Sequence, residues 1–478
     1  MAYMNCVEQV SDGHYVLPQL GDMKTQVDAF LSEKLFFMTD EALWQQAAQA
    51  ASYEGATSLH LMPDTHLGYG IPVGGVLVTD NVIVQAGSGY DISCGMVLVK
   101  VVGLTAKKVR SLDRRRRWIE EVESRVAVGL GSHRPERMRD LSASQVQEMI
   151  HYGAKPLGVN PDLCERPFIP IPEDFDPTKI ERAWKRAIPQ MGSLGGGNHF
   201  IEMLADPEDG SVWVMVHTGS RAYGWHTANH YFHEGGLHRG LAKNRREQSW
   251  LRKDEPLGQE YWAAHNAAAN YAIANRWMIV EGVREAIQEV FNCDIEPFYE
   301  ISHNLVQEEI LTTPVPEGEE HHAHQIRGLV HRKGATRAFP AGHPQLINTP
   351  WLDTGHPVLI PGSMLHGAAI LRPMEGAHTT ACSVNHGSGR VMGRGHAKRK
   401  LACLQEDIDD EMRSVKRKFG PGKGVRVEGI LTNTRKTPLD ECGHVYKELD
   451  EVLQVLVDGG IAKIERRLFP VANIKGTD

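Results

Sequence analysis

Short apolar runs that alternate with glycine-rich turns dominate the first part of the chain. The run LHLMPDTHLGYGIPVGGVLVTDNVIVQAG, residues 59–87, shows this pattern most clearly and predicts strands joined by tight loops. The run VWVMVHTGSRAYG, residues 212–224, predicts a buried strand that leads into a loop. Residues 155–177 are rich in proline and aspartate and predict an irregular segment.

Helical patterns occupy the middle and the end of the chain. Residues 261–291 are rich in alanine, contain almost no helix breaker and predict the longest helix. Residues 114–130 and 401–419 each predict an amphipathic helix, and the second is followed by the turn GPGKG. A helix and a closing strand are predicted within residues 446–476, whereas the polar residues 316–334 are expected to be exposed.

Strand and helix patterns are mixed along the whole chain, which predicts a mixed α/β (α+β) fold. No internal repeat is visible, and no shift in composition marks a linker. We therefore expect a single catalytic domain over residues 1–478, with small insertions near residues 155–180 and 312–330.

The composition is that of an ordinary globular protein, with 41% hydrophobic and 23% charged residues among 478. The formal net charge is -8, which by itself does not indicate a nucleic-acid partner. If the chain binds RNA, local basic patches must do so against the overall field.

The chain shows no sign of a membrane or secreted protein. No apolar run approaches the roughly 18–20 residues that span a bilayer, and the start MAYMNCVEQV lacks the basic and apolar regions of a signal peptide. The seven cysteines are scattered and form no C-x-x-C pair, which favours a reducing cytosol over a disulfide framework. We therefore expect a cytoplasmic protein that does not associate with membranes.

Residues that can bind metals and phosphates stand in glycine-rich loops beside several apolar runs. The segments are MPDTHLGYG, GYDISCG, GSLGGGNHFIEM, VMVHTGSR, ISHNLVQ and VNHGSGRVMGR. They contribute Asp64, His66, Asp91, Cys94, Asn198, His199, Glu202, His217, His303, Asn304, His386 and Arg390. A thiolate, three imidazoles and a carboxylate could hold two borderline divalent metals such as Mn²⁺ or Zn²⁺.

Each of these residues also has an ordinary structural explanation. A single histidine at a strand end is more often a satisfied polar residue than a ligand. Cys94 alone fits a small buried hydrophobe, and the run GGGN fits a turn. The segment GSLGGGN is neither a G-x-G-x-x-G motif nor a Walker A sequence.

Two further histidine groups resemble metal sites. His226 and His230 are four residues apart, which places them on one face of a helix. His321, His322 and His324 form a cluster in a polar segment. Neither group has a carboxylate partner in the sequence pattern, so surface histidines explain both better.

Nine motifs, in order, resemble the signature of the RtcB family of RNA ligases. They are PDTHLGYGIPVGG, GYDISCG, SLGGGNHFIE, HTGSR, SHN, HRKGA, PGSM, HGSGR and the terminal IKG, and they extend from residue 63 to residue 476. The resemblance implies an RtcB-like domain in which mixed sheets and helices surround a central metal and GTP pocket. It also implies that RNA 3′-phosphate or 2′,3′-cyclic phosphate ends are joined to 5′-hydroxyl ends through a covalent histidine–GMP intermediate, with GTP consumed.

The resemblance also assigns metal ligands. Cys94, His199 and His303 match the ligands of one Mn²⁺ ion. Asp91, Cys94 and His217 match the ligands of a second Mn²⁺ ion, with the thiolate of Cys94 bridging the two. Asp64 matches a further acidic residue near the reacting end.

The nucleotide contacts are assigned in the same way. His386 matches the histidine that becomes guanylylated, and the proposed GTP contacts are Asn198, Glu202, Asn304, Ser363, His386, Arg390, Tyr446 and Lys475. Asn198 and Arg390 match residues that hold phosphates. Glu202, Ser363 and Lys475 match contacts to the guanine base, and Tyr446 is a looser match for a residue that stacks on it.

The partner that the resemblance implies is RNA with 3′-phosphate and 5′-hydroxyl ends, bound by a monomer. RNA would be held mainly through its phosphates, and the candidate basic patches are residues 114–117, 238–246, 393–400 and 416–426. We favour residues 393–400 because they directly follow the His386 motif. The need for an activating protein stays open.

Two alternative functions use the same residues. A metal-dependent phosphohydrolase or nuclease would need the metals but no covalent histidine. A GTP- and RNA-binding adaptor would need neither metal chemistry nor a nucleophile.

Overall fold

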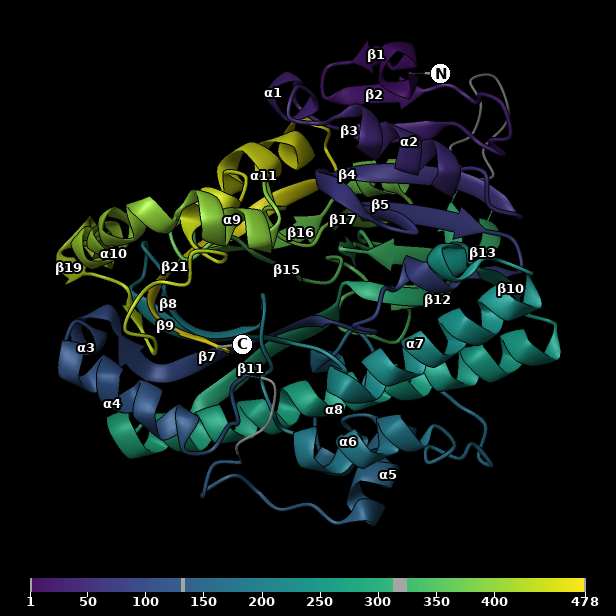
Figure 1. Ribbon diagram of the computed structural model, residues 1–478. Coiled ribbons are helices and arrows are strands. Elements are labelled where there is room, and N and C mark those ends of the chain that lie inside the picture. Colours follow the sequence, from purple (N-terminus) through teal and green to yellow (C-terminus); the bar gives the residue numbers. More distant parts are fainter. Residues whose placement is uncertain (1, 130–133, 313–324, 477–478) are drawn as a thin grey trace.

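Two large sheets organise the protein, which we describe from a computed structural model covering residues 2–129, 134–312 and 325–476 (Figure 1). The seven-stranded sheet has the order β1-β2-β3-β4-β5-β13-β12, and the eight-stranded sheet has the order β11-β7-β9-β8-β21-β16-β15, with β20 beside β21. Neighbouring strands are antiparallel except for the pairs β3–β4 and β20–β21. The predicted mixed α/β class is confirmed.

The strand bounds follow the sheet order. The seven-stranded sheet contains β1 (Glu8–Ser11), β2 (His14–Leu17), β3 (Val27–Phe30), β4 (Ala56–Tyr69), β5 (Ile71–Thr79), β13 (Gln325–Lys333) and β12 (Asn304–Thr312). The eight-stranded sheet contains β11 (Ile295–Ser302), β7 (Gly95–Thr105), β9 (Ser211–Thr218), β8 (Phe200–Ala205), β21 (Ala462–Lys475), β16 (Ala368–Pro373), β15 (Val358–Pro361) and β20 (Leu431–Thr432). Three small pairs are β6 (Val82–Val84) with β10 (Trp250–Arg252), β14 (Ala335–Arg337) with β17 (Ser383–Asn385), and β18 (Lys416–Phe419) with β19 (Val425–Glu428).

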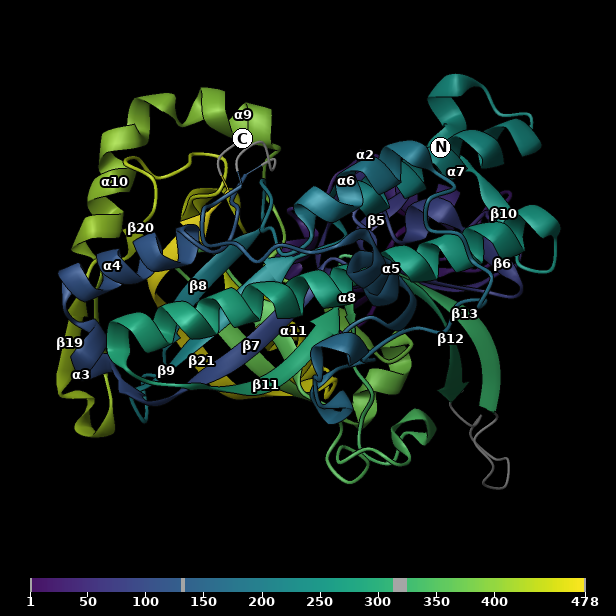
Figure 2. The same cartoon turned by 90° about the horizontal axis from the view of Figure 1, so that it is seen from below.

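The helices cover the sheets. They are α1 (Glu33–Phe36), α2 (Glu41–Ala50), α3 (Ala106–Val109), α4 (Leu112–Glu123), α5 (Ala143–Tyr152), α6 (Glu181–Gln190), α7 (Arg221–His238), α8 (Pro256–Phe291), α9 (Arg394–Lys400), α10 (Gln405–Ser414) and α11 (Leu449–Asp458). Helix α8 runs across the face formed by β7 and β9, and α5 and α7 pack on α8 (Figure 2). Helices α2 and α11 pack against strands of the seven-stranded sheet. None of the helices in the described residues is long and apolar enough to cross a membrane.

Helix α8 is the longest element and lies at the centre of the core. Its 36 residues begin with Pro256 and end with Phe291, and the next residue, Asn292, caps the helix with a φ of 50° in the left-handed region. Trp277 and Val280 of α8 pack with Val97 of β7 and Val214 of β9 in one buried cluster. The helix therefore attaches directly to the strands that carry the candidate ligands.

The elements differ from the sequence predictions mainly at their ends. The strands predicted in residues 59–87, the long helix and the terminal helix and strand are all present, and residues 155–177 are irregular apart from two short 3₁₀ turns. The helix predicted at 114–130 ends at Glu123. The helix predicted at 401–419 ends at Ser414, because the residues that follow pair as β18 with β19. The loop expected after β9 is the start of α7 at Arg221.

The polar segment 316–334 also differs from expectation. Residues 325–333 form β13, which is buried from Gly328 to Lys333 because it pairs with β5 on one side and β12 on the other. Its charged side chains are satisfied inside the protein: Arg332 donates two hydrogen bonds to the carboxylate of Glu309, at 2.6 and 2.7 Å. The histidine cluster at 321–324 lies outside the described residues.

The close contact of β7 with β11 generates a test of this packing. A Cβ atom on Gly95 would lie 2.4 Å from the carbonyl oxygen of Ile301 and 2.8 Å from Cα of Ser302. Gly95→Ala should therefore force backbone apart and lower the free energy of unfolding by ~1–3 kcal/mol or more, as measured by urea denaturation. Gly424→Ala is the matched control, because a Cβ there would meet nothing within 4 Å. Equal stability of the two variants would contradict the packing described.

Candidate active site

The register of the eight-stranded sheet brings together loops that are far apart in the sequence. Gly95, at the start of β7, pairs with Thr218 near the end of β9 and with Ser302 at the end of β11. Phe200, at the start of β8, pairs with His217 of β9. Because neighbouring strands are antiparallel, the start of one strand lies next to the end of the next, on the same side of the sheet. The residues at these strand ends are Cys94, His199, His217 and His303.

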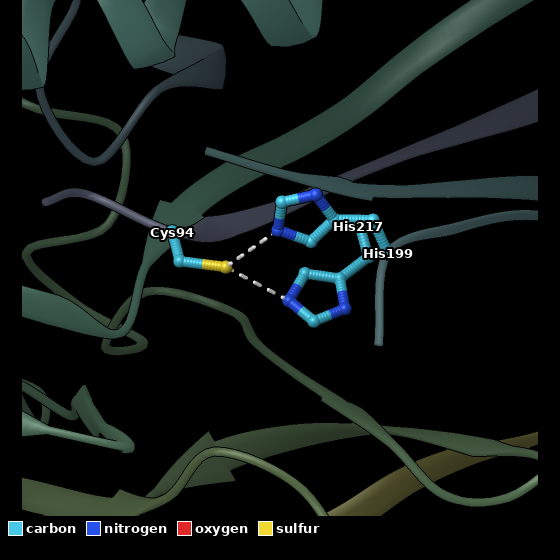
Figure 3. Close-up of side chains that lie close together, drawn as sticks. All are labelled: Cys94, His199 and His217. Atoms are coloured by element: carbon cyan, nitrogen blue, oxygen red, sulfur yellow. Dashed lines mark hydrogen bonds between the residues drawn. The ribbon is translucent and has the colours of Figure 1, made fainter. Parts of the chain in front are cut away.

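A thiol and three imidazoles converge there, and Figure 3 shows Cys94 facing His199 and His217. The Sγ atom of Cys94 lies 3.1 Å from Nε2 of His217 and 3.5 Å from Nε2 of His199. The Nε2 atom of His217 lies 3.2 Å from Nε2 of His303, and Oδ2 of Asp91 lies 2.9 Å from Nε2 of His199. This donor set suits a borderline divalent metal.

The distances divide these donors differently from the resemblance. His199 lies beside Asp91, and His217 lies beside His303. Cys94 lies next to His199 and to His217. The sequence-based division placed His199 with His303 and Asp91 with His217. The sheet register explains the difference, because His217 and His303 both adjoin residues that pair with Gly95, on opposite sides of β7.

Backbone carbonyls fix the orientation of two of these imidazoles. Nδ1 of His199 lies 2.9 Å from the carbonyl oxygen of Leu194, and Nδ1 of His217 lies 3.1 Å from that of Asn198. For the neutral ring of His217, a proton on Nδ1 donated to Asn198 leaves the lone pair on Nε2, which faces the cluster. Burial lowers the pKa of His217 and of His303 well below the ordinary value, so both rings are neutral, the form that binds metals.

The two remaining donors have opposite charge preferences. Burial alone would raise the pKa of Asp91, but the hydrogen bond and charge of His199 lower it to about 2, so this carboxylate is ionised. Burial, and then the charge of Asp91, raise the pKa of the Cys94 thiol well above its ordinary value. A divalent cation reverses this effect on a thiol that binds it, because the cation stabilises the thiolate.

Gly219 makes room for the Asp91 carboxylate. A Cβ atom at this position would lie 2.3 Å from Oδ1 of Asp91. The next residue, Ser220, donates its backbone N–H to the same oxygen at 3.0 Å. The HTGSR segment therefore supplies both a candidate ligand, His217, and the backbone that holds Asp91.

A single buried arginine joins the loops that carry the cluster. The Nε atom of Arg276, in α8, donates to Oε1 of Glu300 at 2.7 Å, and both side chains are inaccessible to solvent. The guanidinium also donates to the carbonyl oxygen of Thr218 at 3.2 Å, to the hydroxyl of Ser302 at 3.1 Å and to the carbonyl oxygen of Ser93. These three residues are the immediate neighbours of His217, His303 and Cys94.

His386 lies next to this cluster, with its ring 5.0 Å from the ring of His303. Its Nδ1 atom lies 2.6 Å from Oδ2 of the fully buried Asp64, and its backbone N–H donates to the same oxygen at 3.2 Å. Lys447 donates to the carbonyls on either side of Asp64, at 3.1 and 2.8 Å. Burial lowers the pKa of Lys447 to about 8, and Asp64 offsets part of that effect. An Nδ1 proton donated to Asp64 leaves the lone pair of the neutral His386 ring on Nε2.

A cavity of about 720 Å³ opens beside His386, between residues of the two large sheets. All the predicted nucleotide contacts line it, together with four of the five predicted metal ligands. These lining residues are Asp91, Cys94, Asn198, Glu202, His217, His303, Asn304, Ser363, His386, Arg390, Tyr446 and Lys475. His199 instead lines a neighbouring cavity, which Asp91 also borders.

The carboxylate of Glu441 is the common partner of the cationic groups of this cavity. Its carboxylate accepts hydrogen bonds from Arg390 at 3.1 Å, from the Tyr446 hydroxyl at 2.6 Å and from Lys475 at 2.9 Å, and it lies 3.5 Å from Arg394. Burial alone would raise the pKa of Glu441, but Lys475 and the two arginines lower it below the ordinary value. Three cations face one carboxylate, so the group presents net positive charge to an anionic ligand.

Glu202, on β8, is a second buried carboxylate that lines the cavity. Asn473 of β21 donates to Oε1 of Glu202 at 2.8 Å. Burial raises the pKa of Glu202 to about 7, although Asn473 and Lys475 lower it in part. A carboxylate with its other oxygen unengaged by the described residues can accept hydrogen bonds from a purine edge.

The other predicted contacts have partners within the protein. Asn304 donates to the carbonyl oxygen of Asp91 at 3.3 Å and accepts from the backbone N–H of Gly334 at 2.7 Å. The hydroxyl of Ser363 lies 3.0 Å from Nδ1 of His366. Asn304 thus holds two site loops together in addition to lining the cavity.

Comparison with known proteins identifies the family of this chain. Residues 46–476 match the family described as "tRNA-splicing ligase RtcB". The tRNA-splicing ligase RtcB of Thermococcus kodakarensis is 34% identical over 471 residues, covering 92% of each chain. The RNA-splicing ligase RtcB of Mycobacterium tuberculosis is 33% identical, covering 87% of this chain and 96% of its own. The tRNA-splicing ligase RtcB of Methanococcus maripaludis is 30% identical, covering 98% of this chain and 99% of its own.

This chain belongs to the RtcB family of RNA-splicing ligases.

The RtcB motifs do not include the two residues that organise the site. Arg276 has a sequence signal, because a charged residue inside the apolar run YAIANRWMIV needs a buried partner. Glu441, in the segment LDECGH, has no pattern that distinguishes it from a surface carboxylate. Its role follows only from the four cationic and hydroxyl groups around it.

The other histidines and basic patches predicted from the sequence differ in how they relate to the site. Among the described residues, the group found close enough to hold a metal is Cys94, His199 and His217, and it includes neither His226 nor His230. Within residues 114–117, Arg115 is buried and donates to backbone carbonyls. Within residues 393–400, Arg394 lines the His386 cavity, and Lys398 lies 3.3 Å from Asp440.

Substitution of Arg276 tests whether the folded structure around the candidate metal ligands depends on this residue. Arg276→Ala leaves the Glu300 carboxylate buried without its partner, so unfolding free energy should fall by ~3–5 kcal/mol. Arg284→Ala removes a partly exposed arginine from the same helix and should cost under ~1 kcal/mol. Urea denaturation measures both.

A second variant separates positioning from stability. Arg276→Met combined with Glu300→Gln should recover stability, because no charge is left unpaired. Affinity for a divalent metal, tested with Mn²⁺, should nevertheless be lower than in the unmutated protein, because the carbonyls beside Cys94 and His217 still lack their donor. Full Mn²⁺ affinity in the double variant, measured by calorimetry, would show that Arg276 does not position the ligands.

Proposed function

We propose that this chain, an RNA ligase by family, joins RNA 3′-phosphate or 2′,3′-cyclic phosphate ends to 5′-hydroxyl ends through a GMP adduct on His386. GTP is the second substrate, and two Mn²⁺ ions are the resident metals. The observation that carries the proposal is the position of His386. It is held at Nδ1 by a buried carboxylate, 2.6 Å away, and its ring lies 5.0 Å from a histidine of the Cys/His cluster.

The donor set fits two ions that share Cys94. Asp91, Cys94 and His199 would hold one ion, and Cys94, His217 and His303 would hold the other, following the distances between these side chains. Bound in this way, two divalent ions neutralise phosphate charge and help to align the entering and leaving oxygens. The protein contributes neutral imidazoles whose orientation is fixed before any ion binds.

His386 is the nucleophile of the first transfer. Its Nε2 atom attacks the α-phosphorus of GTP and pyrophosphate leaves, while the Nδ1 proton stays on the hydrogen bond to Asp64. Asp64 thereby stabilises the positive charge that develops on the ring. A 2′,3′-cyclic phosphate end must first be opened by water, which breaks its bond to the 2′-oxygen and gives a 3′-phosphate. An oxygen of the RNA 3′-phosphate then attacks the phosphorus of the adduct, which releases His386 and leaves GMP on the RNA end.

The second strand completes the reaction. The 5′-hydroxyl oxygen attacks the 3′-phosphorus of the activated end, loses its proton, and GMP leaves. Arg390 and Arg394 hold phosphate charge during these steps, and Glu441 keeps them in place beforehand. The arrangement of charges exists before any substrate binds, so little reorganisation is needed.

Guanine specificity is assigned to Glu202. An ionised carboxylate can accept from both N1–H and the exocyclic amine of guanine, whereas adenine presents an acceptor at N1. The hydrogen bond from Asn473 fixes the carboxylate, and Tyr446 lies at the same cavity. These contacts would favour GTP over ATP.

The raised pKa of Glu202 predicts how GTP binding depends on pH. Below its pKa of about 7 the group is protonated, and it ionises as the pH rises through that value. GTP affinity, measured by calorimetry, should therefore increase between about pH 6 and pH 8. Glu202→Gln should weaken GTP binding roughly 10- to 100-fold at high pH and remove the pH dependence. A variant that keeps both the dependence and the preference over ATP would move the guanine contact elsewhere.

The covalent mechanism is tested by separating its two stages. His386→Ala should form no GMP adduct with labelled GTP and should not join ordinary 3′-phosphate and 5′-hydroxyl ends. Given RNA that already carries a 3′-diphosphoguanosine end, the same variant should regain part of the joining activity, because the last step uses no imidazole nucleophile. Cys94→Ala should fail with both substrates, because each transfer depends on the metals.

The test with His386→Ala has a control variant and a result that would contradict the mechanism. His444→Ala removes an exposed histidine outside the cavity and should behave like the unmutated protein in both assays. A hydrolase or an adaptor predicts no adduct on any variant. Joining of ordinary ends by His386→Ala at the unmutated rate would rule out the covalent histidine.

A further inference from the structure

A cavity of about 890 Å³ lies on one face of the seven-stranded sheet, away from the proposed active site. Side chains that alternate along two strands form part of its wall: Asp28 and Phe30 of β3, and Ser58 and His60 of β4. The end of α11 borders it as well, and Figure 1 shows α11 beside β4. None of the residues that line this cavity lines the one beside His386. We call it the β3–β4 cavity.

The carboxylates around the β3–β4 cavity are not balanced by basic side chains. Four border it: Asp12 in the turn between β1 and β2, Asp28 in β3, Glu33 in α1 and Asp458 at the end of α11. No lysine or arginine is among the described residues that line it, although the whole chain has 52 of them against 60 aspartates and glutamates. The partial negative charge at the C-terminal end of α11 adds to this field. The cavity therefore favours a cation and disfavours a phosphate.

Three of these carboxylates are available to a ligand. Asp12, Glu33 and Asp458 are exposed, and none of them makes an ion pair within the part of the chain that the structure describes. Asp28 is the exception, because its Oδ1 atom lies 2.9 Å from Nε2 of His14. The available carboxylates come from three different elements, so a ligand that meets them all must carry more than one positive group.

A buried histidine in the wall of the cavity has one ring nitrogen without a partner. His60 is only 9% exposed, and its Nε2 atom lies 3.1 Å from the hydroxyl of Ser58. Its Nδ1 atom has no hydrogen-bond partner among the described residues. Burial lowers the pKa of His60 to about 4, so the ring is neutral near pH 7. When Nε2 carries the proton, Nδ1 is an unused acceptor that an N–H group of a ligand would satisfy.

Another part of the cavity wall is apolar. Phe30, Val78, Leu311 and Val455 line it, and each is at most 7% exposed. The ring of Phe30 stacks on that of His14 with centroids 4.9 Å apart, which fixes its orientation. Methylene groups gain free energy when they leave water for such a surface. A cation with a hydrocarbon chain therefore fits the cavity better than an inorganic ion.

We propose that the β3–β4 cavity binds a linear aliphatic polyamine. Its methylene chain would lie against Phe30, its ammonium groups at the exposed carboxylates, and one N–H group at Nδ1 of His60. Aliphatic amines are protonated near neutral pH, as the side chain of lysine is. A monoamine can neutralise only one of the carboxylates, whereas a polyamine can reach carboxylates on different elements. The inference does not depend on the proposed ligase mechanism, because the two cavities share no lining residue.

Binding of radiolabelled spermine tests the carboxylates. Spermine should bind the unmutated full chain without RNA, as measured by equilibrium dialysis. Asp12→Asn combined with Asp458→Asn should weaken this binding roughly 10-fold, since an exposed charge pair contributes a factor of up to about five. Asp294→Asn combined with Asp407→Asn is the matched control, because it changes the net charge equally at exposed positions outside the cavity. The control should alter the affinity less than about twofold.

Displacement of the labelled spermine tests the apolar wall. Putrescine and Mg²⁺ have the same charge, but only putrescine has a methylene chain. Putrescine should therefore displace spermine at a concentration roughly 10-fold lower than Mg²⁺ does.

A third variant tests the buried nitrogen. His60→Phe keeps a ring in the cavity wall and removes the unpaired acceptor, so spermine affinity should fall about fivefold. Thermal unfolding of each variant verifies that it is folded.

Each possible result decides the proposal. Absence of spermine binding to the unmutated protein would overturn it. Equal losses of affinity in the two double variants would also overturn it, because spermine would then respond to the net charge of the chain and not to the cavity. Displacement by Mg²⁺ at concentrations as low as those of putrescine would assign the cavity to inorganic cations. None of these measurements uses GTP or RNA, so failure of the ligase mechanism would leave their outcome unchanged.

Discussion

The buried guanidinium of Arg276 is the constraint on which the candidate active site depends. A buried charge is tolerated only when it is paired and its N–H groups are satisfied. Glu300 supplies the pairing, and the backbone and hydroxyl oxygens of Ser93, Thr218 and Ser302 supply acceptors. Moving any one of these loops would leave part of the guanidinium unsatisfied. The positions of Cys94, His217 and His303 are therefore set by α8, independently of any bound metal.

Buried carboxylates have the corresponding role in the cavity beside His386. Asp64 fixes the ring of His386 through one oxygen, which also accepts the backbone N–H of that residue. Glu441 accepts hydrogen bonds from Arg390, Tyr446 and Lys475 and so holds these three side chains close together in the cavity. Acidic groups thus hold His386 and the cationic groups of this cavity in place on one side of the Cys/His cluster. The overall negative charge of the chain therefore does not describe the local charge of the cavity.

Much of the fold could be predicted because periodicity reports local structure. The alternation in residues 59–87 and the alanine-rich run of α8 are strong local signals, and both elements are present. The errors occur where pairing with distant segments overrides local preference. Residues 416–419 continue an amphipathic pattern but pair as β18, and the polar residues of β13 are buried because β5 and β12 flank them. A hydropathy pattern cannot register a carboxylate such as Glu309, which lies across the sheet and satisfies Arg332.

The sequence by itself determined the family and the residue types that could bind metal, nucleotide and RNA, because these stand in short motifs that can be recognised locally. Only the tertiary structure decided which of them meet. Antiparallel register places His217 beside His303 and leaves Asp91 beside His199, a division that motif order cannot contain. The roles of Arg276 and Glu441 could be recognised only in the structure, for the same reason. Packing in space decides which groups pair with a buried charge, and the spacing of these groups along the chain does not reveal the pairing.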